Sequence, residues 1–316
     1  MYHIIGASSV HRFRADKKDV DQAGRRISLL GSLDGRPALL IAERAPFSTE
    51  QIHLQLISSS FSRIRNLGAN DIYYWFLAHC NSSSSKSEES SEIAPDYKIN
   101  LIYPCTEKHI KKYSQQGLRV VAETPAIYHN HVRPYMQQQR DEGRLNWVFN
   151  ILEGRAEQED VMYQEHGIEG FLVSPDLNWD RKTLTSLHVL GVVERRDIWS
   201  LRDLTTGHIE WLKHMRQKFI DTTVKLYPEV EKDELKLYVH YQPTYYHFHV
   251  HIVHVMLDAG STQAVGKALG LENVISTLEN LKEGKGMADL TLTYHVGEFS
   301  EVWTEIFLPL KENGQL

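Results

Sequence analysis

The chain has 316 residues, 41% of them hydrophobic and 24% charged, a composition typical of a soluble globular protein with enough length for two domains. Its 35 basic and 41 acidic side chains give a formal net charge of −6, which argues against a long, non-specific nucleic-acid groove, so no DNA partner is expected. A small phosphate-bearing ligand held by a few local cations stays compatible with this charge.

The sequence shows no apolar signal core at its start and no apolar run long enough to span a membrane. We therefore expect an intracellular protein without a membrane partner. Its two cysteines, Cys80 and Cys105, are then expected to be free and buried rather than joined in a disulfide.

The first quarter of the chain predicts an arm and a hairpin. Residues 1–25 are polar and predict an arm without regular structure. Residues 28–33 and 38–43 are apolar runs on either side of an Asp-Gly pair at 34–35, which is a strong hairpin signal. Residues 81–92 are almost entirely Ser, Glu and Lys, and they predict a disordered loop.

A long helix is expected near the middle of the chain. It should begin at Pro125, a residue suited to a first turn, and end where Gly143 stops it. We interpret residues 125–145 as a hinge helix between an N-terminal domain over residues 1–124 and a C-terminal domain over residues 146–316. Before it, the predictions are strands at 100–104 and 119–123 and a short helix start at 106–109.

The second half of the chain alternates short strands with amphipathic helices, which predicts an α+β fold with an antiparallel sheet. Thr206 is expected to cap a helix that buries Leu212 and Phe219, and a later helix should bury Leu271 and Leu278. The predicted strands are 146–152, 160–164, 170–173, 187–194, 234–241 and 246–256, with a turn at 174–176 and the last two strands as neighbours.

The last of these strands contains a row of histidines. Residues 245–255 read Tyr-Tyr-His-Phe-His-Val-His-Ile-Val-His-Val. In an extended strand His247, His249 and His251 share one face, and the apolar residues between them share the other, which should face the core.

Three interpretations of such a row are open. A divalent metal site would use the imidazoles as ligands, but no His-Glu-x-x-His or paired-cysteine pattern accompanies them. The second is that these histidines face solvent by coincidence. The third, which we favour, is phosphate chemistry, in which a neutral imidazole attacks phosphorus and its neighbours stabilise charge on the phosphoryl oxygens.

The string His-Phe-His-Val-His-Ile-Val at 247–253 resembles the His-φ-His-φ-His-φ-φ signature of the histidine-triad nucleotide hydrolases and transferases. The preceding His-Tyr-Gln-Pro-Thr-Tyr-Tyr at 240–246 resembles the scavenger mRNA decapping enzymes of that superfamily, and the resemblance runs from about Asn70 to the C-terminus. It implies a smaller N-terminal α+β domain and a C-terminal histidine-triad domain, in a homodimer whose N-terminal domains are swapped.

The same resemblance implies an activity. It is hydrolysis of the 7-methylguanosine triphosphate cap on cap dinucleotide or short capped RNA fragments during mRNA decay, without metal or cofactor. The implied product is 7-methylguanosine monophosphate. The implied location is the cytoplasm, with a nuclear share left open.

The triad histidines receive distinct roles. By the resemblance, His249 is the nucleophile that forms a phosphohistidine intermediate. His251 is expected to donate to a phosphoryl oxygen, and His247 to orient the row through a supporting hydrogen bond. The parity of His254 is opposite, which favours a structural role.

The resemblance also implies residues that hold the cap. Trp147 and Glu157 should bind the methylated base, whose positive charge suits an indole face and a carboxylate, and Asp176 should contact the nucleoside. Lys267 is expected at the start of the late helix, where anions are favoured. The remaining implied substrate contacts are Lys112, His240, Thr244 and Tyr245, with Asn70 and Tyr73 in the N-terminal domain.

One position departs from the pattern. Asn178 stands where relatives commonly have lysine, so one phosphate-side charge is absent and the activity is in question. The alternatives are a catalytically weak cap-binding regulator of the same family, a broader dinucleoside polyphosphate hydrolase, and a zinc-binding interaction module.

Overall fold

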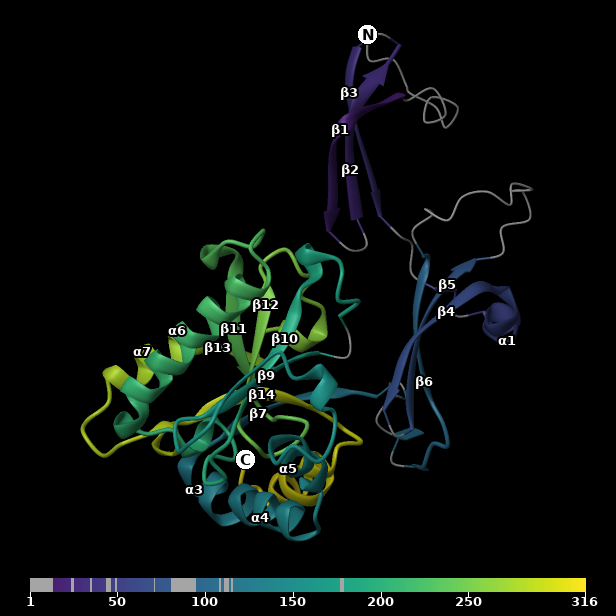
Figure 1. Cartoon of the computed structure of the whole chain (residues 1–316). Coiled ribbons are helices and arrows are strands. Elements are labelled where there is room, and N and C mark those ends of the chain that lie inside the picture. The colour runs from purple at the N-terminus through teal and green to yellow at the C-terminus, as the bar shows by residue number, and fades with distance from the viewer. Residues whose placement is uncertain are drawn as a thin grey trace, which may run out of the picture. The chain divides into compact units, whose positions relative to one another are not determined.

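In the computed structural model the chain divides into two compact units, Glu43–Gln115 and the larger Met1–Ala42 with Gln116–Leu316 (Figure 1). No helix among the described residues is long and apolar enough to cross a membrane. The residues that the structure describes are 14–23, 26–34, 36–43, 47–48, 50–70, 72–80, 95–107, 109–110, 114, 116–176 and 179–316.

A six-stranded sheet organises the larger unit, and every neighbouring pair in it is antiparallel. The α+β class and the pairing of the last two strands are therefore confirmed. In spatial order the strands are β13 (Ala268–Gly270), β11 (Leu235–His240), β12 (His249–His254), β10 (His188–Val193), β9 (Phe171–Pro175) and β8 (Tyr163–Glu165).

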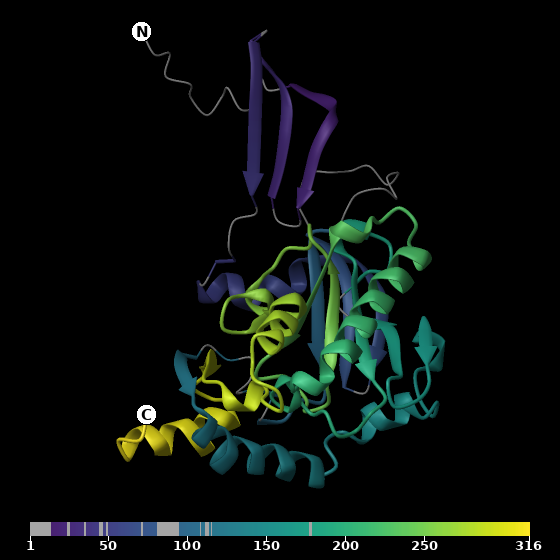
Figure 2. The same ribbon diagram turned by 90° about the vertical axis from the view of Figure 1, so that its left-hand side faces the viewer.

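One face of this sheet carries the main core. Two helices cover it, α6 (Ile209–Leu226) and α7 (Leu271–Glu279), and Figures 1 and 2 show α6 running along the strands. Val250 and Ile252 of β12 point into this core with Phe219 of α6, as the sequence predicts. At Gly191 a Cβ would lie 2.2 Å from the Phe219 ring, so only glycine permits this close packing.

The opposite face carries a smaller apolar cluster. It is covered by α5 (Asn146–Leu152), whose Val148 and Leu152 pack on Leu172 and Val192 of the sheet. The predicted strand at 146–152 is therefore wrong. Positions 148 and 152 are one helical turn apart, and the nearly unbroken apolar run did not distinguish this period from a buried strand.

The helix predicted from Pro125 is present as one helical stretch, with α3 (Pro125–Ile127), a π-helical turn (Tyr128–Val132) and α4 (Arg133–Asp141), whereas its role as a hinge between domains stays a prediction. Thr124 caps its start through its side-chain oxygen.

The other elements of the larger unit include two further groups of strands. They are β1 (Arg14–Ala23), β2 (Arg26–Leu33) and β3 (Arg36–Glu43) in one sheet, and the pair β7 (Leu118–Glu123) and β14 (Leu292–Gly297). The remaining helical elements are a π-helical turn Trp303–Phe307, α8 (Leu308–Glu312), and 3-10 turns at Gln158–Asp160, Leu184–Ser186, Leu201–Asp203, Thr206–His208, Lys232–Glu234, Ser261–Gln263 and Met287–Asp289.

The smaller unit is an antiparallel three-stranded sheet with a short helical segment before it. Its elements are α1 (Gln51–Leu56), a 3-10 turn (Ile57–Ser60), β4 (Phe61–Asn70), β5 (Tyr73–Cys80) and β6 (Tyr97–Ile102). The predicted loop at 81–92 lies outside the described residues. Both cysteines are free but exposed, so their predicted burial is wrong.

Several boundaries differ from the predictions. The arm predicted over 1–25 is wrong for β1, where polar residues form an edge strand, and residues 1–13 are outside the described part. Thr205 rather than Thr206 is the N-cap of the turn before α6, where its backbone oxygen accepts from the His208 nitrogen at 2.9 Å and its own nitrogen donates to His208 Nδ1 at 3.0 Å. The turn predicted at 174–176 begins late, since β9 continues through Pro175.

Candidate active site

A row of aromatic rings lies on the α5 side of the six-stranded sheet, opposite the main core. The indole of Trp147 meets the Tyr245 ring edge-on at 4.9 Å, and Tyr245 stacks on His249 at 4.2 Å and 17°. The His249 and His251 centroids are 5.3 Å apart, and those of His251 and His240 are 4.3 Å apart. The structure thus brings five predicted site residues together in one line.

The His249 ring is held in a single useful tautomer. Its Nδ1 lies 2.8 Å from the backbone oxygen of His247, and only a protonated Nδ1 can donate to a carbonyl. The lone pair therefore lies on Nε2, the atom that would attack phosphorus. Stacking on Tyr245 fixes the plane of the ring.

The other triad histidines differ in their partners. The strand predicted over 246–256 begins only at His249, so His247 lies in the segment before β12. Its Nε2 donates to the Val193 oxygen of β10 at 2.6 Å, and its backbone oxygen rather than its ring orients His249. His251 Nδ1 lies 2.9 Å from Nε2 of His188, whereas its own buried Nε2 has no hydrogen-bond partner. An unpaired buried nitrogen is costly unless a ligand completes it, which suits a phosphoryl contact.

Burial sets the charge of the row. Desolvation lowers the pKa of His240, His247 and His249 to about 4, and it lowers the pKa of His251 well below its usual range. Nearby Lys267 further lowers the pKa of His240. At neutral pH the histidines of this row are uncharged, so the Nε2 lone pair of His249 is not occupied by a proton.

These lowered pKa values predict a pH dependence of stability. His240, His247 and His249 have folded pKa values of about 4 against 6.5 ordinarily, so between these values the unfolded chain binds more protons. The free energy of unfolding should fall as the pH falls through this window, by up to about 1.4 kcal/mol per pH unit for each group, with full stability present above it. Urea denaturation from pH 7 down to about 5 measures the slope. His247→Asn should flatten it, and identical slopes in both proteins would contradict this assignment.

A lysine approaches the row from the neighbouring edge of the sheet. Lys267 Nζ donates to the Gln242 backbone oxygen at 2.6 Å. Its predicted place at a helix start is wrong, because β13 separates it from α7, which begins only at Leu271. Lys112 and Asn178 lie outside the described residues.

A network of buried polar side chains surrounds Gln242, the residue whose backbone oxygen binds Lys267. The Glu123 carboxylate is fully buried and accepts from the Tyr241 hydroxyl at 2.6 Å, the Tyr294 hydroxyl at 2.5 Å and Gln242 Nε2 at 3.1 Å. Arg202, also buried, pairs with the same carboxylate at 2.6 Å. The network therefore holds the Gln242 side chain in place, and with it the Gln242 backbone oxygen that accepts from Lys267.

The predicted base-binding residues lie around α5. Trp147 is 47% exposed on this helix, an unusual exposure for tryptophan and one that leaves an indole surface open to a ligand. Glu157 is half-buried in the turn after α5 with φ 53°, and it is not part of the ring row. Asp176 follows β9 with Oδ2 3.7 Å from His188 Nε2, and Thr244 is exposed in the loop before β12.

Two predicted residues belong to the smaller unit. Tyr73 begins β5, where its ring lies 6.1 Å from Trp75 and 6.1 Å from His109. Asn70 ends β4. Both stay predictions as cap contacts.

The sequence predictions missed His188. This histidine begins β10 and reaches His251 through its Nε2, because β10 and β12 are paired with His188 opposite Val253. The available signal was a lone histidine inside the apolar run at 187–193. Its partner His251 is 63 residues further along the chain, and the register between their two strands, which brings them together, cannot be read from the sequence.

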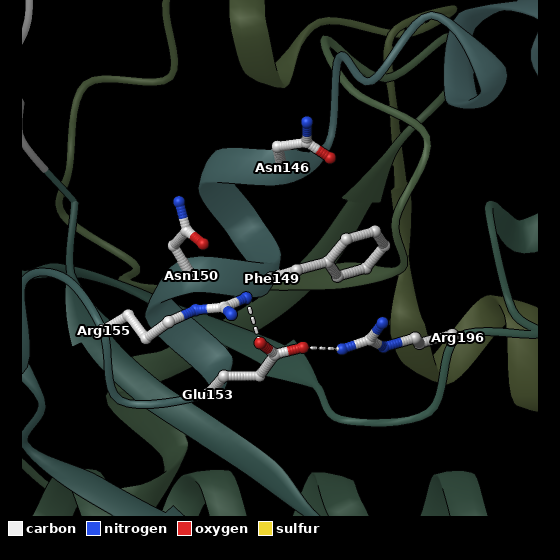
Figure 3. A pocket seen from close by; sticks show the side chains of 6 residues that line it. All are labelled: Asn146, Phe149, Asn150, Glu153, Arg155 and Arg196. Carbon is white, nitrogen blue, oxygen red and sulfur yellow. Dashed lines mark hydrogen bonds and ion pairs between the residues drawn. The ribbon is translucent and has the colours of Figure 1, made fainter.

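A separate pocket of about 490 Å³ lies on another side of α5 (Figure 3). Glu153 pairs there with both Arg155 and Arg196, so its single negative charge offsets one of the two positive charges and the three side chains keep a net charge of +1. None of the predicted site residues line it, although Phe149 also packs edge-on against the His247 ring at 5.7 Å. Its lining residues are Asn146, Phe149, Asn150, Glu153, Arg155 and Arg196.

An antiparallel sheet that presents this neutral histidine row defines the histidine-triad class of protein. Residues 146–266 match the family model described as scavenger mRNA decapping enzyme C-term binding, and residues 8–116 match scavenger mRNA decapping enzyme (DcpS) N-terminal. The chain belongs to the scavenger mRNA decapping enzyme family, which confirms the family predicted from the triad.

Its similarity to curated relatives covers most of the chain. It is 36% identical to the m7GpppX diphosphatase of Schizosaccharomyces pombe over 91% of both chains. The Caenorhabditis elegans protein of that name is 33% identical over 93% of this chain and 86% of its own length. The human one is 34% identical over 79% of this chain and 69% of its own length.

Proposed function

We propose that the chain hydrolyses the 7-methylguanosine triphosphate cap of cap dinucleotide or short capped RNA fragments and releases 7-methylguanosine monophosphate. The observation that carries the proposal is the pair of imidazoles, His249 and His251, at the centre of the histidine row. His249 is locked with a free lone pair on Nε2, and the adjacent His251 has a buried Nε2 without a protein partner. The relatives named m7GpppX diphosphatase support this substrate class.

The reaction proceeds by double displacement at phosphorus. His249 Nε2 attacks the phosphorus nearest the methylated nucleoside, and the bond to the bridging oxygen breaks so that its electron pair leaves with the diphosphate end of the second nucleotide. Water then attacks the phosphohistidine and releases one proton to the solvent, the electron pair of the phosphorus–nitrogen bond returns to Nε2, and His249 is again neutral with its proton on Nδ1. His251 donates from Nε2 to a phosphoryl oxygen, and the charge of Lys267 offsets that of the triphosphate.

This proposal has a direct test. The purified chain is incubated with methylated cap dinucleotide, and the products are identified by mass spectrometry in water enriched in the heavy oxygen isotope. We expect 7-methylguanosine monophosphate carrying one heavy oxygen, together with an unlabelled diphosphate. Binding without hydrolysis would instead support the regulator, and equal turnover of unmethylated dinucleotide would support the broader hydrolase.

Trp147 provides a prediction about the base. Its half-exposed indole suits stacking on the cationic methylated ring, so Trp147→Ala should weaken binding of methylated cap by about 1–3 kcal/mol. Calorimetric titration of the wild type and the variant measures the difference. Unmethylated dinucleotide, which lacks the ring charge, is the matched control and should lose less. Equal affinity of wild type and variant for the methylated cap would remove Trp147 from the site.

We also infer a cytoplasmic homodimer in which the N-terminal domain contributes Asn70, Tyr73 and Lys112 to the cap site. Exposed apolar side chains on β7 support association, since Leu118 is 66% and Val120 is 77% exposed on the same side of that strand. The molecular mass in solution, measured by sedimentation, distinguishes a dimer from a monomer.

A further inference from the structure

The sheet brings together a set of metal-ligating side chains that the triad motif does not contain. Asp176 after β9, His188 on β10 and His251 on β12 each offer one ligand atom, and these atoms lie within 4.8 Å of one another. Within the part of the chain that the structure describes, only this group of three or more His, Cys, Asp or Glu side chains meets that spacing. Three neighbouring strands supply it, and the Asp176 backbone nitrogen donates to the His188 oxygen at 2.9 Å.

Two of the ligand-atom distances bracket the spacing expected around a tetrahedral ion. His188 Nε2 lies 2.9 Å from His251 Nδ1 and 3.7 Å from Asp176 Oδ2. Ligand atoms at the usual zinc distances of about 2.0–2.2 Å lie about 3.3 Å apart around a tetrahedral centre, a value between these two. Two imidazoles must share one proton at 2.9 Å, and a metal ion can replace that proton without moving the strands.

We propose that Asp176, His188 and His251 bind a divalent transition-metal ion of the Zn²⁺ class, and that the bound ion inhibits cap hydrolysis. Two imidazoles and one carboxylate form a donor set that Zn²⁺ accepts with water in the fourth position, whereas Mg²⁺ prefers a shell of oxygens. The burial of His251 shields its bond to the ion from solvent.

The inhibitory half of this proposal rests on the proposed function. An ion in this cluster occupies the Asp176 carboxylate that would otherwise contact the nucleoside. It also occupies Nδ1 of the His251 ring, whose other nitrogen, Nε2, would donate to the phosphoryl group. Metal binding and productive substrate binding therefore compete for the same two side chains.

The binding half is tested without substrate. The full chain is stripped with chelator, titrated with Co²⁺ while the visible absorption is followed, and titrated with Zn²⁺ by calorimetry. We expect one ion per chain, and His188→Asn should weaken the affinity by about tenfold or more. The matched control is His166→Asn, which removes another histidine–carboxylate pair, His166 Nδ1 to Glu194 at 2.6 Å, outside the cluster. This control should bind like the wild type.

A second variant and two folding measurements distinguish loss of a metal ligand from loss of the folded structure. Asp176→Asn should weaken the metal affinity too, and circular dichroism with thermal unfolding should show that both variants fold. A wild type that binds neither ion, or one that binds no more tightly than the folded His188→Asn and Asp176→Asn variants, overturns the metal site.

The inhibitory half uses hydrolysis as its readout. One equivalent of Zn²⁺ should suppress hydrolysis by the wild type, excess chelator should restore it, and whatever rate His188→Asn retains should resist the same Zn²⁺ concentration. Zn²⁺ bound to the cluster without loss of rate overturns inhibition. A metal-free chain that hydrolyses no cap contradicts the proposed function instead, while the substrate-free titration still decides the metal site.

Discussion

His249→Asn should lower kcat for cap hydrolysis by about 10⁴-fold or more while cap binding persists, because asparagine keeps the hydrogen bonding and approximate shape but offers no nucleophilic nitrogen. The loss follows from the position of His249, whose Nδ1 is held by the His247 oxygen and whose ring is stacked on Tyr245. Single-turnover kinetics and a separate binding titration with methylated dinucleotide measure the two effects independently.

The matched control for this variant is His254→Asn. His254 is buried on the same strand but faces the other side of the sheet, where its Nδ1 accepts from the Met256 nitrogen at 3.1 Å. Losing this contact should cost about 1–2 kcal/mol of stability and leave the rate per folded molecule unchanged. Hydrolysis by His249→Asn at a rate near that of His254→Asn would defeat the assignment of the nucleophile.

The sequence contained the central part of this site because a strand has a period of two. Alternation alone placed His249 and His251 on one face, with Val250 and Ile252 in the core, and the structure has this arrangement. Short-range patterns of this kind need no knowledge of what lies opposite. The helix that begins at Pro125 was predictable for the same reason, since Pro125 and Gly143 are local start and stop signals.

The features that could not be predicted depend on contacts between distant segments. His188 belongs to the site only through the register of β10 on β12, and Lys267 reaches Gln242 rather than a helix start. Asn146–Leu152 became a helix because the sheet offered Leu172 and Val192 as a surface for Val148 and Leu152. Tertiary packing decided that segment, whose run of apolar residues suits either structure.

The buried ion pair of Arg202 and Glu123 gives the largest predicted effect on stability. Arg202 and Glu123 both have fully buried side chains, and Arg202 Nη1 also donates to the backbone oxygens of Met287 and Leu290, each at 2.6 Å. Arg202→Met leaves a carboxylate in the core without its cation, so the free energy of unfolding should fall by about 3–5 kcal/mol. Urea denaturation measures it. The surface control is Lys232→Met, whose pair with Asp221 is largely exposed and should contribute about 1 kcal/mol or less.

A double variant distinguishes loss of the pair from loss of packing. Arg202→Met combined with Glu123→Gln removes both charges, so its destabilisation should be smaller than the sum of the two single effects. Additive losses would show that the charges are not coupled and that the Arg202 side chain acts through its carbonyl contacts. The same network holds Gln242, and hence the oxygen that anchors Lys267. Arg202→Met should therefore also lower kcat/KM at temperatures where the variant is folded, because the lysine loses its fixed position beside the histidine row.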